Sequence, residues 1–189
     1  RLSDKGGDNC DVMLMTATPI PRTLTMTIYG DMDLSIIREK PNTRKPIKTY
    51  SKLESKIDDV IRFIQKEIKL GNQIFWVCPL IEESKKLDHS SAVKKFEYLK
   101  KIFPDQVSLL HGKTEINEKE LILNKFIKNE YKILVSTTII EVGIDFPNAN
   151  VIIIENANKF GLSQLHQLRG RVCRGDKAST CILMFKSNL

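Results

Sequence analysis

Two arginines three residues apart, Arg171 and Arg174, follow Gln167 and Gly170 near the end of the chain. A guanidinium group stays charged in proteins, and its planar set of N–H donors can bind two phosphate oxygens at once. An arginine that reaches a γ-phosphate also stabilises the charge that spreads over it during phosphoryl transfer. Taken alone, a basic helix end is more often a solvated surface, so the rest of the chain has to decide between the two interpretations.

Composition and charge limit the class of protein. The 189 residues are 41% hydrophobic and 28% charged, which is typical of an ordinary globular chain. Most of the net charge of +7 lies in residues 46–189, which hold 23 Lys and Arg against 17 Asp and Glu. This excess favours a polyanionic partner such as nucleic acid, although solvated lysines account for it equally well.

Several classes of site and location are not supported by the sequence. No run approaches the roughly 20 apolar residues that span a membrane, and residues 1–11 lack the apolar core of a signal peptide. The four cysteines form no C-x-x-C pair, and the three histidines form no H-E-x-x-H motif. We therefore expect no membrane partner, no metal site and no disulfide framework, and a cytoplasmic location.

Apolar periodicity predicts alternating strands and helices. The expected strands are at 12–15, 35–38, 47–50, 74–80, 107–110, 133–135, 151–154 and 181–185. The expected helices are at 21–29, 57–68, 93–103 and 117–128, and a short helix leads into the arginine segment. Asn117 and Ser163 are expected to cap the last two helices, with Leu121 facing inward. Residues 40–46 have the proline-rich, basic composition of a linker.

Strands that are apolar throughout, separated by amphipathic helices, predict an α/β fold with a parallel sheet covered by helices on both faces. In such sheets ligands bind beyond the carboxyl ends of the strands, where the motifs below are expected to lie. From the residues alone, Thr137 and Thr138 are also explained by β propensity, and His111-Gly112 by an ordinary strand-to-helix turn. Trp76 is expected in the core.

Four segments occur in the order of motifs III to VI of superfamily-two helicases, and together they resemble that family. They are Thr16–Pro19, Phe75–Leu80, Ser136–Asp145 and Gln167–Arg174, the last approaching the pattern Q-x-x-G-R-x-G-R. Within the superfamily, Tyr29-Gly30-Asp31 and Cys78-Pro79-Leu80-Ile81-Glu82-Glu83-Ser84 resemble the RecG helicases of bacteria, which act on branched DNA. The resemblance extends from about Val12 to Phe185. It implies a RecA-like fold, with residues 1–45 as the end of a first motor domain and a linker, and 46–189 as a second motor domain truncated at its C-terminal end.

The resemblance also implies the roles of particular residues. Arg174 would be the arginine finger and Arg171 a second γ-phosphate contact. The nucleotide-binding set would be Gln167, Gly143, Asp145, Arg171 and Arg174. The DNA-binding set would be Thr137, Thr138, His111, Gly112 and Arg169, and the residues that couple hydrolysis to movement would be Thr16 and Thr18.

The chain departs from the family pattern in two respects. Cys173 stands where the family has glycine, which would strain the backbone by roughly 1–3 kcal/mol if φ is positive there, and its arginine neighbours predict a reactive thiol that ATP shields. Neither G-x-x-x-x-G-K-[ST] nor D-E-x-H is present, so this domain alone is predicted not to hydrolyse ATP. The strand at 12–18, separated from its own sheet, is expected to be disordered or to pair elsewhere.

The resemblance therefore implies a domain of an ATP-dependent helicase that remodels stalled forks and recombination junctions. ATP with Mg²⁺ would bind only in the intact two-domain motor, and the expected partners are branched or forked DNA and an upstream first RecA-like domain. The alternatives are a duplex translocase of the transcription-repair coupling type, a small-molecule α/β enzyme, and an inert module that binds nucleic acid. The Thr16–Thr23 string also occurs in the coupling translocase.

Overall fold

The computed structural model describes residues 13, 15, 35–37, 45–79, 85–137, 146–172 and 177–187, and in 85–90 the backbone alone. Contacts between Cα atoms divide the chain into two units, Arg1–Glu39 and Lys40–Leu189. In the first unit the described residues lie in neither helix nor strand, and Met13 and Met15 are 77% and 79% exposed. The strand predicted at 35–38 is therefore wrong over 35–37, and the one at 12–15 is wrong at Met13 and Met15.

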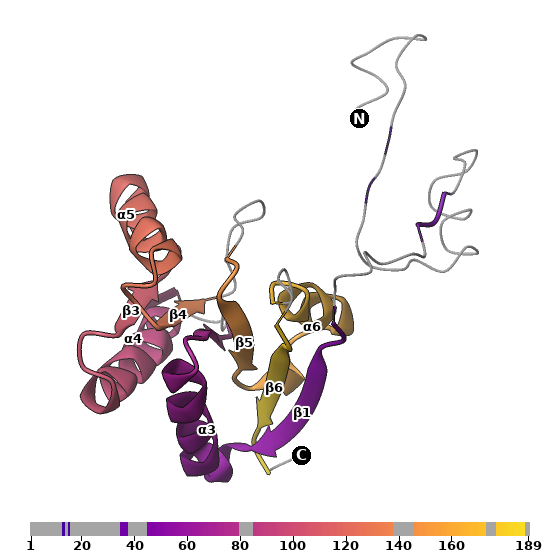
Figure 1. The fold of residues 1–189 in the computed structure, drawn as a ribbon, viewed down its shortest axis with the longest axis horizontal. Coiled ribbons are helices and arrows are strands. Elements are labelled where there is room, and N and C mark those ends of the chain that lie inside the picture. The colour runs from indigo at the N-terminus through magenta and orange to yellow at the C-terminus, as the bar shows by residue number, and fades with distance from the viewer. Residues whose placement is uncertain are drawn as a thin grey trace, which may run out of the picture. The chain divides into compact units, whose positions relative to one another are not determined.

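The second unit is built on a six-stranded parallel sheet (Figure 1). Its strands, in sheet order, are β1 (Lys48–Leu53), β6 (Thr180–Phe185), β5 (Ala149–Ile154), β2 (Gln73–Cys78), β4 (Ile133–Thr137) and β3 (Val107–Leu110). Every residue of β2, β4 and β5 is buried, which explains why these strands are apolar almost throughout rather than alternating.

Helices cover both faces of this sheet and create two cores. On one face, α3 (Ile57–Lys69) and α4 (Lys85–Ile102) pack through Ile64 and Leu99 against every second residue of the strands, such as Trp76 in β2. On the other face, α5 (Ile116–Ile127) and α6 (Leu162–Arg169) pack through Phe126 and Leu168. The predicted α/β fold with helices on both faces is thus confirmed, and Trp76, which is 0% exposed, is a core residue as expected.

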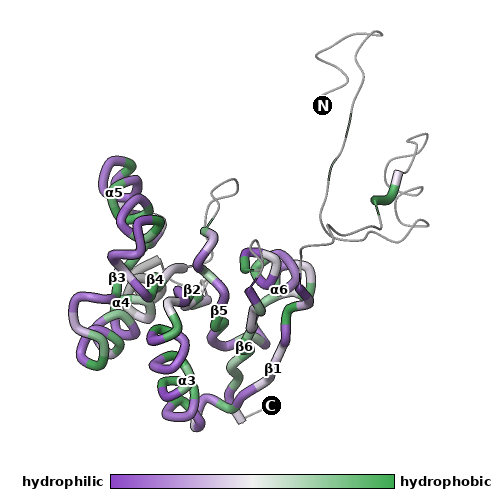
Figure 2. The backbone as a smooth tube through the Cα atoms, viewed as in Figure 1, coloured by the Kyte–Doolittle hydropathy of each residue, from purple (hydrophilic) through white to green (hydrophobic). Residues whose placement is uncertain are grey.

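The local sequence accounts for the limits of α3. Val60, Ile61 and Ile64 form its buried side, and Figure 2 shows short hydrophobic (green) and hydrophilic (purple) segments alternating along the tube of this helix. The chain leaves the helix at Gly71, where φ is +81°, a left-handed conformation that glycine adopts without a steric cost. The amide of Gly71 donates to the Ile68 carbonyl at 2.9 Å and satisfies one of the last carbonyls of the helix.

Three details of the predicted helices are wrong. Helix α5 begins at Ile116 with Glu115 at its N-cap, so Asn117 lies inside the helix. Its inward residues are Ile122, Leu123 and Phe126, whereas Leu121 is 54% exposed, because Leu121 lies about 100° around the helix from Ile122. Helix α6 has Gly161 rather than Ser163 at its N-cap.

Within the described residues, no helix has the length and apolar character needed to cross a membrane.

Candidate functional site

Helix α6 holds the start of the arginine segment (Figure 1). At its beginning, the Gly161 amide donates to Oε1 of Gln164 at 3.0 Å, which satisfies an otherwise unpaired helical donor. At its end, Leu168 and the following Val172 are buried, and they fix this turn on the sheet. Gln167 directly precedes the first of these anchors and is exposed. Arg171 lies between the two anchors and is partly buried. Both side chains of the predicted nucleotide set that the structure describes therefore lie on one short, anchored turn.

The remaining members of that set, Gly143, Asp145 and Arg174, lie outside the described residues. The same is true of Cys173, Thr138 and the two coupling threonines Thr16 and Thr18. Their predicted roles stay predictions.

Arg169 makes contacts within the domain. Its Nη2 lies 3.2 Å from Nδ1 of His166, one helical turn earlier. Its charge also acts on Cys181 in β6: burial raises the pKa of this thiol to about 11, and the positive charge of Arg169 opposes that rise. Arg169 therefore lies near β6 and is partly buried, and its predicted contact with DNA stays a prediction.

The loop after β3 uses several of its polar groups internally. The His111 amide donates to the Thr114 hydroxyl at 3.1 Å, and the Lys113 amide donates to Nδ1 of His111 at 3.2 Å. The Thr114 amide donates to the His111 carbonyl at 3.0 Å. Gly112 is exposed, and the space where a side chain would stand is open. Within the part of the chain that the structure describes, the Gly112 amide donates to no protein group.

Thr137 lies beside this loop. It is the last residue of β4, and the preceding residue, Ser136, is the register partner of Leu110, so that Thr137 stands opposite His111. Thr137 is 5% exposed, next to its register partner Cys78 in β2. Little of this residue is therefore open to solvent, and its predicted contact to a phosphate stays a prediction.

The predicted residues thus fall into two groups. His111, Gly112 and Thr137 meet at the carboxyl ends of β3 and β4, on one side of the sheet order. Gln167, Arg169 and Arg171 lie on α6 and the residue pair after it, against the buried core formed partly by β5 and β6. Within the described residues, no cluster of three His, Cys, Asp or Glu could hold a metal ion.

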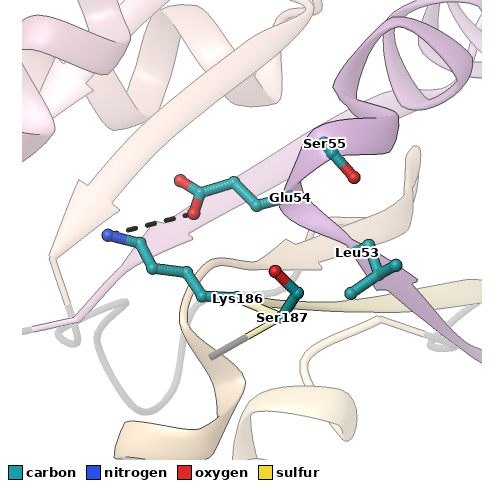
Figure 3. Close-up of a pocket in the computed structure, with 5 residues that line it drawn as sticks. All are labelled: Leu53, Glu54, Ser55, Lys186 and Ser187. Carbon is teal, nitrogen blue, oxygen red and sulfur yellow. Dashed lines mark ion pairs between the residues drawn. The ribbon is translucent and has the colours of Figure 1, made fainter. Parts of the chain in front are cut away.

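A shallow hollow lies at the carboxyl ends of β1 and β6 (Figure 3). Leu53, Glu54, Ser55, Lys186 and Ser187 line it, and Lys186 Nζ lies 4.0 Å from Glu54 Oε2. Both charged side chains are well exposed, so their attraction is weak. Neither the sequence motifs nor the buried clusters extend into this hollow, and we assign it no role.

Sequence reasoning missed one buried polar contact near the site, between Lys95 of α4 and Glu155. Two signals could have found it. Glu155 directly follows the apolar strand β5, and Lys95 lies on the helical stripe that includes Ala92 and Leu99, both 0% exposed. A charge at an apolar position predicts a partner across the interface.

Comparisons with known proteins agree with this architecture. Residues 55–176 match the family described as the helicase conserved C-terminal domain. The chain is 50% identical over 186 residues to the ATP-dependent DNA helicase RecG of Bacillus subtilis (strain 168), which covers 97% of this chain and 27% of that protein. It is 53% identical over 173 residues to RecG of Aquifex aeolicus (strain VF5), covering 91% of this chain and 22% of that protein.

Solved structures show the same fold. The structure of RecG bound to a three-way DNA junction matches with a TM-score of 0.75 and 44% identity, over 90% of this chain and 22% of that chain. S. cerevisiae Dbp5 bound to RNA and ADP BeF3 matches with a TM-score of 0.64 over 92% of this chain and 44% of that chain, and at 21% identity it shows the fold alone. The sheet and its helices are those of a RecA-like helicase C-terminal domain. The chain spans about a quarter of the length of the RecG relatives. It belongs to the helicase conserved C-terminal domain family, in the form that RecG helicases carry.

Proposed function

We propose that residues 46–189 are the second motor domain of an ATP-dependent helicase that remodels branched or forked DNA, and that residues 1–45 are the end of the first motor domain and a linker. The similarity to RecG along 97% of the chain supports this proposal. The relative whose structure is bound to a three-way DNA junction supports branched DNA as the substrate class.

The observation that carries the proposal is the position of Gln167 and Arg171. Both lie at the end of α6, on a turn anchored by buried Leu168 and Val172, with Gln167 exposed beyond the core. In the intact motor this turn would face ATP held by the first domain. Arg171, with Arg174, would then place guanidinium charge against the γ-phosphate as negative charge spreads over it. Gly143 and Asp145 would contribute to the nucleotide-facing surface of the same half-site.

Mg²⁺ would accompany ATP and neutralise phosphate charge. The described residues offer no cluster of carboxylates, histidines or cysteines that fits a metal ion. We therefore assign its protein ligands to the first motor domain, and we assign to this domain only the arginine and glutamine contacts.

DNA would be held at the other group of residues. Gly112, with its open amide, lies just past the carboxyl end of β3, and Thr137 is the last residue of the neighbouring strand β4. A backbone amide can donate to a phosphate oxygen without reading the base, which suits a motor that moves along any sequence. Thr138 and His111 would complete this surface, Arg169 would contact DNA from the other group of residues, on α6, and Thr16 and Thr18 would couple DNA binding to hydrolysis.

The test is ATP hydrolysis by the full-length protein, with and without forked DNA, for wild type, Arg171→Ala and Arg174→Ala. Loss of a γ-phosphate arginine is expected to lower DNA-stimulated turnover by about 10³-fold. Arg62→Ala is the matched control, because Arg62 is an exposed arginine on α3 that pairs only with Asp59 among the described acids. Wild-type turnover in both arginine variants would overturn the proposal. Unwinding of the fork, rather than movement along duplex DNA alone, separates it from a duplex translocase.

A further inference from the structure

A buried ion pair joins α4 to the end of β5. Lys95 Nζ lies 2.7 Å from Glu155 Oε1, and the two side chains are only 16% and 10% exposed. The thiol of Cys78 donates to the other carboxylate oxygen of Glu155 over 3.7 Å. Lys95 Nζ also lies 5.1 Å from the ring centre of Trp76 and 5.2 Å from that of Tyr98. Lys95 is thus held by one ion pair and two aromatic rings, and the Glu155 carboxylate by that ion pair and one thiol, in a largely dry position. Among the described residues, Oε1 of Glu155 has no hydrogen-bond partner, so the ion pair holds it by charge alone.

This pair lies on the face of the sheet that carries α4, and the chain that leaves it leads to the opposite face. Lys95 belongs to α4, on the face of the sheet that also carries α3. Glu155 directly follows β5, and its amide donates to the Val77 carbonyl at 2.9 Å, so its backbone still belongs to the sheet. From Glu155 the chain runs to α6, which packs on the opposite face.

The connection between Glu155 and α6 is short and conformationally specific. Asn156 has φ 45° and ψ 50°, a left-handed conformation that asparagine tolerates better than most residues. One 3-10 turn, η3 (Ala157–Lys159), follows, and α6 begins at Leu162 after its N-cap Gly161. Rotation of the chain at Glu155 would therefore be passed on to α6 over only a few residues.

Helix α6 depends on this connection because its own packing is limited. It has eight residues, of which Leu168 is buried and Leu165 is partly buried against the same core, and Leu162 at its start is 87% exposed. The two buried anchors of the arginine turn lie near the end of the helix and just after it, so the direction of the helix also depends on the segment before it, in which Ala157 is buried. The orientation of Gln167 and Arg171 is therefore determined at both ends, by Leu168 with Val172 and by the turn that begins at Glu155.

We propose that Lys95 and Glu155 form a positioning pair, which holds the β5–α6 connection so that Gln167 and Arg171 are oriented for ATP hydrolysis. The proposal rests on the proposed function of the domain. A buried ion pair is seldom more stable than an apolar pair of similar volume, and an apolar pair lacks the attraction that holds Lys95 Nζ 2.7 Å from Glu155 Oε1. Orientation is thus the property that the charges add.

This reasoning gives a test that separates positioning from stability, in the full-length protein with forked DNA. Lys95→Met leaves the Glu155 charge buried without its partner, and it is expected to lower both Tm and kcat. The double variant Lys95→Met/Glu155→Leu is expected to regain the wild-type Tm while its kcat stays at least tenfold low, with the KM for ATP within about threefold of wild type. Lys95→Arg keeps the positive charge of the ion pair, and its kcat is expected to equal that of wild type. Lys94→Met, on the exposed side of the same helix, is the control and should leave both quantities unchanged.

A double variant with wild-type Tm and wild-type kcat would overturn the proposal, because the pair would then only fill space. If the double variant does not regain Tm, Glu155→Gln decides, since it keeps the volume and the hydrogen-bonding capacity of the side chain but removes its charge. Wild-type kcat in Glu155→Gln would equally overturn the proposal, and a tenfold loss at unchanged KM would support it. Arg171→Ala in the same assay distinguishes the two failures: if it lowers kcat and the pair variants do not, the positioning role alone is wrong.

Discussion

The side-chain amide of Gln73, the first residue of β2, donates to the carbonyl oxygen of Phe126 at 2.6 Å and thereby ties the sheet to the last turn of α5. The same nitrogen donates to the Tyr131 carbonyl at 2.7 Å, just before β4. Gln73 is 1% exposed, so both N–H groups are used in a place that water does not reach. One side chain therefore fixes the path of the chain from α5 into its next strand.

Replacing Gln73 by methionine keeps the length of the side chain and removes both donors. Two buried carbonyl oxygens then lose a partner, so the free energy of unfolding is expected to fall by about 1–3 kcal/mol. Gln65→Met is the control, because Gln65 is exposed on α3 and its replacement should change stability by less than about 0.5 kcal/mol. Urea denaturation of the three proteins measures the effect. Equal stability of the Gln73 and Gln65 variants would show that these hydrogen bonds contribute nothing net.

The two described cysteines predict how stability changes at alkaline pH. Burial raises the pKa of Cys181 from 9.0 to about 11, and burial beside the Glu155 carboxylate raises the pKa of Cys78 still further. Above pH 9 the unfolded chain loses thiol protons that the folded chain keeps, so the stability that is present at pH 8 is lost as pH rises towards 11. Each thiol contributes a slope of about 1.4 kcal/mol per pH unit in this window.

Denaturation at pH 8, 9, 10 and 10.5, for wild type and Cys181→Ala, checks this prediction. Lysine deprotonation affects both proteins equally, so the difference between their slopes isolates the thiol. The variant should be less stable at pH 8, because it leaves a small cavity, and should lose less stability than wild type above pH 9. Parallel slopes for the two proteins would mean that Cys181 ionises as readily in the folded state as in the unfolded one.

The sheet and its two helix layers could be predicted because they follow from local patterns. The fully apolar runs that became β2, β4 and β5 are typical of strands buried on both faces, and the helical spacing at 57–68 matches α3. Strand β1 was predicted to end at Tyr50 but extends to Leu53, because it is an edge strand whose polar, exposed residues give no apolar signal. Its pairing with β6 determines its length.

The candidate site was less predictable because part of it depends on contacts between segments that are far apart in the sequence. The arginine segment and the loop at His111 could be proposed because each is a short run of neighbouring residues that resembles a family motif. Lys95 and Glu155 were missed because their contact joins distant segments, and only folding brings the two charges together. The buried position of Thr137 could likewise not be predicted from the sequence, since its exposure depends on how β4 pairs with β2 and β3.

Gly112 gives the sharpest test of the proposed DNA surface. Its amide lies in an exposed loop whose neighbouring amides at His111 and Lys113 already donate within the loop. Gly112→Pro removes this donor, whereas Gly112→Ala keeps it and adds a methyl group where no atom lies within 4 Å. A hydrogen bond to a charged phosphate contributes about 1.5–3 kcal/mol. The proline variant of the full-length protein is therefore expected to bind forked DNA about tenfold or more weakly, and the alanine variant as tightly as wild type.

Binding should be measured at one fixed salt concentration, because affinity for a polyanion depends steeply on ionic strength. The Tm of each variant has to be within about 2 °C of wild type, which shows that proline has not unfolded the loop's surroundings. Equal affinity of all three proteins would exclude the Gly112 amide as a phosphate contact. Equal weakening by alanine and proline would instead mean that DNA passes too close to Gly112 for any side chain, a steric requirement rather than a hydrogen bond.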